Sequence, residues 1–281
     1  FVFEIRDLWP ETLITMGAVK ERSLQARIMY ALEKWMLKRA RAVVALLPGI
    51  AGYVESRGIN PGKVVWIPNG VALTDRAEAC PDFQDARVAG GTFTFMYFGA
   101  FGNANDLWTM VDAYHRFRQS SPDADTMLRM IGDGPLKAQL QEHVDAMGAS
   151  SVVFESPVPK KDIRALARQA DAFLLTVRDL PELYRYGISM NKLFDYMAAS
   201  KPTIIANCAL NDPIKESGGG ISVPSEDREA LAGAMKEMVE LPEKERMEMG
   251  YRARKFVEEK HSFEVLSKKL ADTLDEAIGQ K

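Results

Sequence analysis

A short segment in the second half of the chain carries the residue types best suited to hold an anionic ligand. A loop containing Gly187 and Ser189 leads into a predicted helix that begins near Asn191. Lys192 lies in the first turn of this helix, where the helix dipole favours anions rather than cations. A cation there is easier to understand if it shares an anionic ligand with the free backbone amides. Asp195 follows one turn later on nearly the same face, suited to accept hydrogen bonds from a diol. From residue types alone, a solvated surface pair between Lys192 and Asp195 explains the pattern equally well.

The second candidate is the turn YFGAFGNANDL at residues 97–107. Gly99 and Gly102 would let the backbone approach a ligand closely, and amides at the start of the following helix favour a phosphate group. A tight turn in which Asp106 caps the helix is an equally good explanation. This turn by itself therefore does not identify a ligand.

Two further features are interpreted as structural. The turn IGDGPLK (131–137) follows a predicted strand, and Pro135 suits the first position of the next helix. His115, His143 and His261 all fall in predicted helices, without the spacing of a catalytic triad or a metal site.

The elements that must position these residues follow the alternation of a parallel α/β protein. Apolar runs predict strands, and apolar residues at helical spacing predict helices between them. The first series has strands at 1–5, 43–48 and 64–70 and helices at 21–40 and 50–57. The second has strands at 93–99, 126–134, 152–156, 172–177, 203–207 and 220–223, with helices at 107–119, 135–147, 160–170 and 191–200. Helices at about 243–261 and 263–279 close the chain. Five or six strands alternating with helices predict a doubly wound parallel sheet, in which ligands bind at the carboxyl ends of strands.

The composition is that of an ordinary soluble globular protein. Hydrophobic residues make up 47% and charged residues 27%, and the formal net charge of −3 excludes a strong general attraction to nucleic acid. No stretch approaches the roughly 18 apolar residues that span a bilayer. With Cys80 and Cys208 as the only cysteines, we expect a reducing, cytoplasmic compartment. Basic residues surround Trp35 in the 21–40 helix. A cluster of this kind usually marks a solvated helix face, and less often a peripheral contact with the inner face of an anionic membrane.

An ordered series of motifs extends over essentially the whole chain. It comprises RDLWPE (6–11), IPNGV (67–71), YFGAFG (97–102), IGDGP (131–135), VVFESPV (152–158), QADAFLL (169–175) and GISMNKLFDYMAASKPTIIA (187–206). The series resembles that of retaining GT-B glycosyltransferases, the large family that includes sucrose synthase. Within that family it is most similar to the bacterial polysaccharide branch, whose signature reads G-x-S-P-N-K-L-F-E-Y-M-A.

The resemblance implies two Rossmann-like domains with the reaction in the cleft between them. Residues 1–72 would be the C-terminal remnant of the acceptor-binding domain, and 73–92 the linker. Residues 93–260 would form the nucleotide-sugar-binding domain, and 261–281 a helix that crosses back to the first domain. Because the chain opens inside a strand at Phe1 rather than at Met, we expect that upstream residues complete the acceptor domain.

The resemblance also assigns the site. The pyrophosphate would lie under the turn of Gly99 and Gly102, base contacts would come near Pro157 and Val158, and Asp195 would hold the ribose hydroxyls. The residues expected to bind the donor are Gly99, Gly102, Asn103, Val158, Ser189, Asn191, Lys192 and Asp195. The implied partners are a nucleotide-sugar donor, with UDP favoured over GDP, and a saccharide or lipid-linked acceptor, and no metal is expected.

Several positions depart from the family pattern. The first acid of its Glu–seven residues–Glu motif falls on Gly187, Asn105 stands where many relatives carry a phosphate-binding Lys, and Met190 replaces a Pro. Ala72 follows PNGV where Asp is common. These departures place more weight on Lys192.

The implied reaction is sugar transfer with retention, in which helix-terminal amides and Lys192 stabilise the leaving diphosphate. No residue is identified as a catalytic nucleophile or general base. We therefore expect the 281 residues alone to bind nucleotide but to transfer sugar slowly or not at all. Alternatives are a non-catalytic nucleotide-sugar-binding fragment and an NAD-dependent oxidoreductase, although the glycine spacing of the latter is incomplete.

Overall fold

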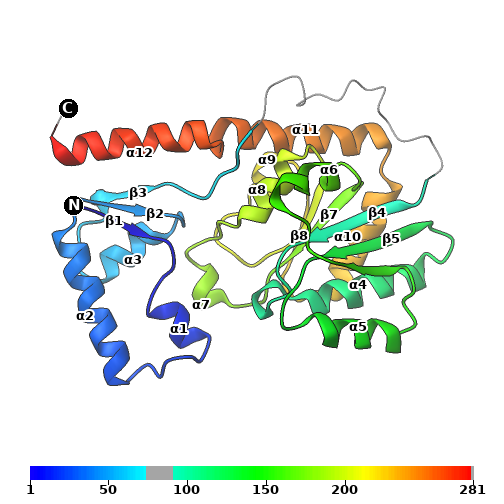
Figure 1. Cartoon of the computed structure of the whole chain (residues 1–281), viewed down its shortest axis with the longest axis horizontal. Helices are drawn as coiled ribbons and strands as arrows, with labels where there is room; N and C mark the ends of the chain where they lie inside the picture. Colours follow the sequence, from blue (N-terminus) through cyan, green and yellow to red (C-terminus); the bar gives the residue numbers. More distant parts are fainter. Residues whose placement is uncertain (74–90, 280–281) are drawn as a thin grey trace.

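A computed structural model describes residues 1–73 and 91–279. The predicted linker at 73–92 and Cys80 therefore lie almost wholly outside the described residues. The described part contains two parallel sheets, one of three strands and one of six (Figure 1).

The smaller sheet has the order β1-β2-β3, with β1 at Val2–Ile5, β2 at Ala42–Ala45 and β3 at Val64–Trp66. The short α1 (Glu11–Thr15) and the long α2 (Leu24–Arg39) connect β1 to β2, and α3 (Ile50–Ser56) connects β2 to β3. Side chains of the strands, α2 and α3 form one apolar cluster that includes Leu37, Val43 and Tyr53.

The larger sheet has the order β6-β5-β4-β7-β8-β9, with every pair parallel. Its strands are β4 (Phe93–Phe98), β5 (Thr126–Ile131), β6 (Val152–Glu155), β7 (Ala172–Thr176), β8 (Thr203–Ala206) and β9 (Gly220–Val223). The chain runs outward from β4 to β6, then returns to the other side of β4 with β7. The direction of winding reverses at β4 and β7, and in open α/β sheets the ligand crevice lies outside the strand ends at this point.

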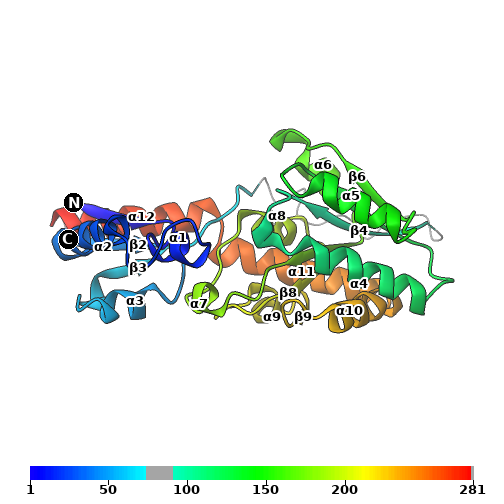
Figure 2. The same cartoon turned by 90° about the horizontal axis from the view of Figure 1, so that it is seen from below.

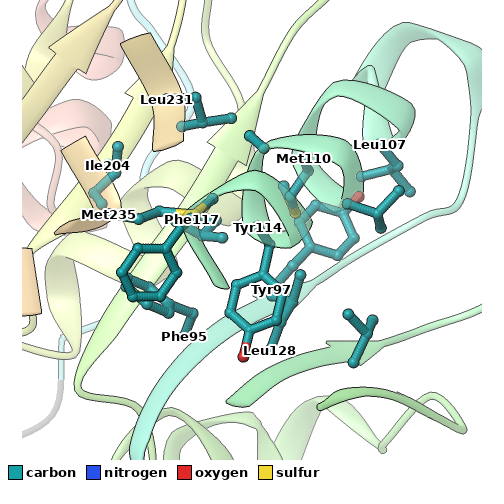
Figure 3. Close-up of a cluster of buried hydrophobic side chains, with 14 of the residues drawn as sticks. Phe95, Tyr97, Leu107, Met110, Tyr114, Phe117, Leu128, Ile204, Leu231 and Met235 are labelled. Atoms are coloured by element: carbon teal, nitrogen blue, oxygen red, sulfur yellow. The ribbon is translucent and has the colours of Figure 1, made fainter. Parts of the chain in front are cut away.

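Helices cover both faces of this sheet. One face packs on α4 (Leu107–Ser120), α5 (Lys137–Ala146) and α10 (Arg228–Glu240), which bury Met110, Leu140 and Met235 with strand residues. Figure 3 labels Met110 and Met235 in this cluster. The other packs on α6 (Ile163–Ala167), α8 (Asn191–Ala198), α9 (Pro213–Ser217) and α11 (Glu243–Lys260). Residues of β4, β5, β7 and β8 are buried in these two clusters, as expected of strands covered on both faces.

The two sheets are joined by contacts as well as by the chain. α12 (Phe263–Ile278) continues from α11 and extends over the small sheet, where Leu266 packs with Val44 and Ile67 (Figure 1). Val71 and His261 run alongside each other at the crossing, with the Val71 amide 3.0 Å from the His261 carbonyl oxygen. α1 contacts α7 (Pro181–Tyr184), which lies between the two sheets in both views (Figure 2).

The predicted α/β order and parallel sheets are confirmed, and six strands form the second sheet. Two expectations were wrong in detail. Pro135 does not open α5, which begins at Lys137 with Leu136 at the N-cap position. The predicted elements also omit α1, α7, α9 and α10, although the Asp227 side chain caps α10 by accepting from the Ala230 amide.

Candidate functional site

The N-terminus of α8 lies beside the reversal of the large sheet. α8 buries Leu193, Phe194, Tyr196 and Met197 and leaves Asn191 exposed. The Tyr196 hydroxyl donates to the Phe98 carbonyl oxygen at 2.9 Å and accepts from the Phe98 amide at 3.0 Å. One buried side chain thus fixes α8 to the end of β4 and, with it, Lys192 to the turn that follows β4.

Lys192 points into that turn rather than toward Asp195. Its Nζ donates to the Tyr97 hydroxyl at 3.0 Å and to Asn105 Oδ1 at 2.6 Å. A Cβ built on Gly99 would lie 3.3 Å from the same nitrogen, so the predicted lysine and the predicted glycine turn are in contact. Within the described parts of the chain, no carboxylate forms an ion pair with Lys192.

Burial without a counter-ion disfavours the charged form of this amine. It lowers the pKa of Lys192 to about 7, well below the ordinary value of a lysine. The first amides of a helix have no intrahelical acceptor and together carry a partial positive charge. Lys192 and the start of α8 therefore form a cationic end that no carboxylate of the described residues neutralises, which suits a diphosphate.

The turn after β4 is shaped by its neighbours. Asn105 Nδ2 and the Tyr97 hydroxyl both donate to the Ala100 carbonyl oxygen, at 2.8 and 2.7 Å. Gly102 precedes a single 3₁₀ turn, Asn103–Asn105, in which the Asn103 side chain is exposed. Thr176 Oγ1, at the end of β7, donates to the Asn105 carbonyl oxygen at 2.5 Å. Both central strands therefore hold this turn in place.

The IGDGP turn has the structural role expected of it. A Cβ on Gly132 would lie 1.9 Å from the Gly99 carbonyl oxygen, and one on Gly134 would lie 2.7 Å from that of Phe101. The two glycines thus let the turn after β5 pack directly against the turn after β4.

Asp195 is half-buried and lies three residues after Lys192 on α8. Burial raises the pKa of its carboxyl, while Lys160 and Arg164 oppose that rise. These two cations belong to the segment that follows β6, where Val158 packs partly against the cluster on this face of the sheet. The predicted ribose acid and the predicted base segment thus border the same region, one turn of helix beyond Lys192.

The polar atoms of Ser189 are engaged by a residue of the small-sheet half of the chain. The Ser189 hydroxyl accepts from the Asn69 amide at 2.7 Å, and the Ser189 carbonyl oxygen accepts from Asn69 Nδ2 at 2.6 Å. Gly187 is close-packed, with φ of +104°, and a Cβ there would approach Asn211 Oδ1 to 2.5 Å and Pro48 Cδ to 2.6 Å. This backbone has no room for the acidic side chain that the family motif places at Gly187.

Other charged or hollow places do not compete with this site. His143 pairs with Asp112, and His261 is buried between the rings of Phe194 and Phe256. An open hollow lined by Arg116 and residues 224–229 mixes both signs of charge and includes none of the predicted residues. Over residues 1–73 and 91–279, no group of three or more His, Cys, Asp or Glu side chains could hold a metal, and no helix is long and apolar enough to cross a membrane.

Sequence reasoning missed the side chains that hold Lys192 in place. The sequence pattern assigns Tyr97 only to a strand, and Asn105 only replaces a lysine of the family motif. Neither has a local signal, because each contacts Lys192 across about 90 residues of sequence. The engagement of Ser189 by Asn69 was missed for the same reason.

Comparisons with known proteins bear on the family and the fold of this chain. The family model described as "Glycosyl transferases group 1" matches residues 92–240, just over half of the chain. A probable glycosyltransferase of Pseudomonas aeruginosa, WbjE, is 23% identical over 255 residues, which cover 86% of this chain and 60% of the relative. The chain thus spans less than two thirds of the length of that curated relative.

Solved structures show the same fold at low sequence identity. Sucrose-phosphate synthase from Thermosynechococcus elongatus has a TM-score of 0.73 at 16% identity, covering 100% of this chain and 68% of its own. Anabaena HepE, solved with UDP and glucose, has a TM-score of 0.69 at 16% identity, covering 98% and 71%. TarM of S. aureus, solved as a mutant with UDP and saccharide ligands, has a TM-score of 0.68 at 12% identity, covering 86% and 46%. The expected GT-B fold with Rossmann-like sheets is confirmed.

Proposed function

The chain belongs to the glycosyl transferases group 1 family, and from this membership we propose that it takes part in moving a sugar from a UDP-sugar to a saccharide or lipid-linked acceptor. We further propose that transfer retains the anomeric configuration and serves the synthesis of bacterial surface polysaccharide. The observation that carries the donor assignment is the half-buried Lys192 at the start of α8, held by neutral partners against the Gly99 turn.

The proposed role of this end of α8 is to stabilise the leaving diphosphate. Negative charge develops on the diphosphate as its bond to the sugar breaks, and a preorganised cation with aligned amides stabilises that charge without further reorganisation. The Lys192 amine, neutral for about half of the molecules near pH 7, would become fully charged beside the phosphates. Because this charge comes from the chain itself, we propose that donor binding requires no metal ion.

The remaining donor contacts follow from the direction of α8. Asp195 would accept hydrogen bonds from the ribose hydroxyls, and the segment at Val158 would border the base. UDP is favoured because Anabaena HepE, which shares the fold, was solved with UDP and with UDP-glucose. No residue of this chain is proposed as a nucleophile or base.

Calorimetric titration with UDP, GDP and NAD tests this assignment. We expect UDP to bind, GDP to bind more weakly, and added EDTA to change neither affinity. Binding of NAD without UDP or GDP would support the oxidoreductase alternative. UDP binding together with no transfer from any UDP-sugar by the protein in its full natural length would support a non-catalytic binding role.

For the acceptor side, we propose peripheral contact of α2 with an anionic membrane. α2 turns a continuous apolar stripe outward, with the side chains between 51% and 72% exposed: Leu24, Ile28, Leu32 and Trp35. Cations flank the stripe at Arg27, Lys34, Lys38 and Arg39. The one carboxylate of the helix, Glu33, is buried and accepts from the Tyr53 hydroxyl at 2.7 Å. An apolar stripe with only cations exposed beside it complements an anionic lipid surface.

Vesicle flotation tests this contact. The protein should float with vesicles that contain phosphatidylglycerol and much less with pure phosphatidylcholine, and Trp35→Ala combined with Lys34→Glu should abolish flotation. Lys244→Glu, at an exposed position of α11, is the matched control for charge reversal. Equal flotation of both variants would contradict a role for α2.

A further inference from the structure

The loop that leads into α8 is held by residues of both halves of the chain, the half with the small sheet and the half with the large sheet. We call Tyr186–Ser189 the bridging loop. From the small-sheet side, the Gly49 amide donates to the Tyr186 carbonyl oxygen at 2.9 Å. The Tyr186 ring packs edge-on against Tyr53 of α3, with 5.5 Å between ring centroids. Although it belongs to the large-sheet half of the chain, the loop thus begins inside the contact surface of the small sheet.

The end of the bridging loop is held by Asn69, which follows β3. Asn69 donates twice to Ser189, once from its amide to the hydroxyl and once from Nδ2 to the carbonyl oxygen. A carbonyl oxygen fixed in this way also fixes the direction of the following peptide, which leads through Met190 to the first amides of α8. Two residues separate Ser189 from Lys192.

The large sheet supplies a separate anchor in the middle of the loop. Asn211 Oδ1 accepts from the Ile188 amide at 2.7 Å, and Asn211 Nδ2 donates to the Ile188 carbonyl oxygen at 3.1 Å. Ile188 is therefore held by the loop's own half of the chain, whereas Tyr186 and Ser189 are held by the other half. The path of the loop between these anchors depends on how the two halves are docked.

We infer that Asn69 is a positioning residue for the donor site: it holds the bridging loop so that the first amides of α8 and Lys192 face the diphosphate. Docking of the small sheet and completion of the anion site are then coupled. This inference rests on the proposed binding of a nucleoside diphosphate at α8, and extends it to a residue of the other half of the chain.

The coupling predicts different effects on the binding of UDP and of uridine, which lacks the phosphates. Loss of the Asn69 hydrogen bonds should disturb the amides that face the phosphates more than the ribose and base contacts, which lie one turn of helix farther along. The variant should therefore bind UDP more weakly but keep its affinity for uridine. A general loss of folding would instead weaken the binding of both ligands alike.

The experiment compares Asn69→Ala and Asn69→Asp with Asn60→Ala as the matched control. Asn60 also lies in the small-sheet half, and its side chain accepts one local hydrogen bond from the Gly62 amide at 2.9 Å. Losing one net hydrogen bond is worth a factor of about five in an equilibrium constant. We expect Asn69→Ala to lower the affinity for UDP by about fivefold and the affinity for uridine by less than twofold. Asn69→Asp should weaken UDP at least as much, because a carboxylate cannot donate to Ser189.

Hydrogen exchange without nucleotide provides a second readout. Amides of 187–193 should exchange faster in both Asn69 variants and keep wild-type rates in Asn60→Ala. If Asn69→Ala does not fold, Ser189→Ala removes the other hydrogen bond, from the Asn69 backbone amide to the Ser189 hydroxyl. Faster exchange of residues 187–193 in that variant then carries the test. UDP affinity and exchange rates indistinguishable from those of Asn60→Ala would overturn the inference. If wild-type protein binds no UDP, the proposed function fails, and the exchange rates alone still decide whether Asn69 positions the loop.

Discussion

Binding of UDP should be coupled to uptake of a proton by Lys192. In the free protein, burial holds the pKa of this amine at about 7, and its partners Tyr97 and Asn105 are neutral. An adjacent diphosphate favours the charged amine and should restore the pKa toward the ordinary lysine value of about 10.4. The sign follows directly: the ligand binds the protonated amine, so affinity falls as the pH rises above 7.

The size of the effect follows from the same pKa. Between pH 7 and pH 9 the protonated fraction of free Lys192 falls about 50-fold, so the UDP affinity should fall by up to this factor. At pH 8 about 0.9 proton should be taken up for each UDP bound. The last ionisation of a phosphate group lies near pH 6, so the ligand itself contributes little in this range.

Calorimetry at pH 8 in two buffers of different ionisation enthalpy measures the uptake. Lys192→Met has a neutral side chain of similar length and should show no uptake, with an affinity at pH 7 below that of the wild type at pH 9, where the bound amine is still charged. Uridine, which lacks phosphates, should show no uptake with either protein. A UDP affinity that stays constant from pH 7 to pH 9, with no proton taken up by the wild type, would refute the placement of Lys192 beside the diphosphate.

Substitutions at three other residues test the remaining parts of the site. Asp195→Ala should weaken the binding of UDP by about 1–3 kcal/mol, and Asp195→Asn should weaken it less, because the amide oxygen still accepts hydrogen bonds. An unchanged calorimetric affinity of the folded Asp195→Ala variant would exclude the ribose role. Tyr196→Phe should lower the free energy of unfolding by about 1–3 kcal/mol, because the buried peptide at Phe98 loses its partner; an unchanged denaturant midpoint would contradict this. Gly99→Ala should weaken the binding of UDP, because the new Cβ would lie 3.0 Å from the Tyr97 hydroxyl. Gly52→Ala, with no atom within 4 Å of its new Cβ, should leave UDP binding unchanged. Equal UDP affinities of the two variants would show that the turn is not close to the ligand.

The parallel sheets could be predicted from sequence because their strands are continuous apolar runs, such as AFLLT at Ala172–Thr176, buried on both faces. The carboxyl ends of β4 and β7 then locate the crevice by topology alone. By contrast, α10 was not among the predicted helices, although Leu231, Met235 and Met238 recur at helical spacing on its buried face.

The residues of the candidate site could be proposed from the sequence, but the side chains that support them could not. Lys192 conflicts with the helix dipole, and a local conflict of this kind is by itself an indication of function. Its partner Tyr97 and the contact of Ser189 with Asn69 arise only from tertiary packing, which no local pattern records. The choice between a ligand-facing Lys192 and a surface pair with Asp195 likewise required the geometry, which directs the amine toward the turn after β4.

A crystal structure with UDP bound tests the central claim most directly. We predict that the diphosphate lies against the first amides of α8, within hydrogen-bond distance of Lys192 Nζ. The ribose should lie on Asp195 and the base beside Val158. UDP bound instead in the hollow lined by Arg116 and residues 224–229, with the start of α8 unoccupied, would contradict the account.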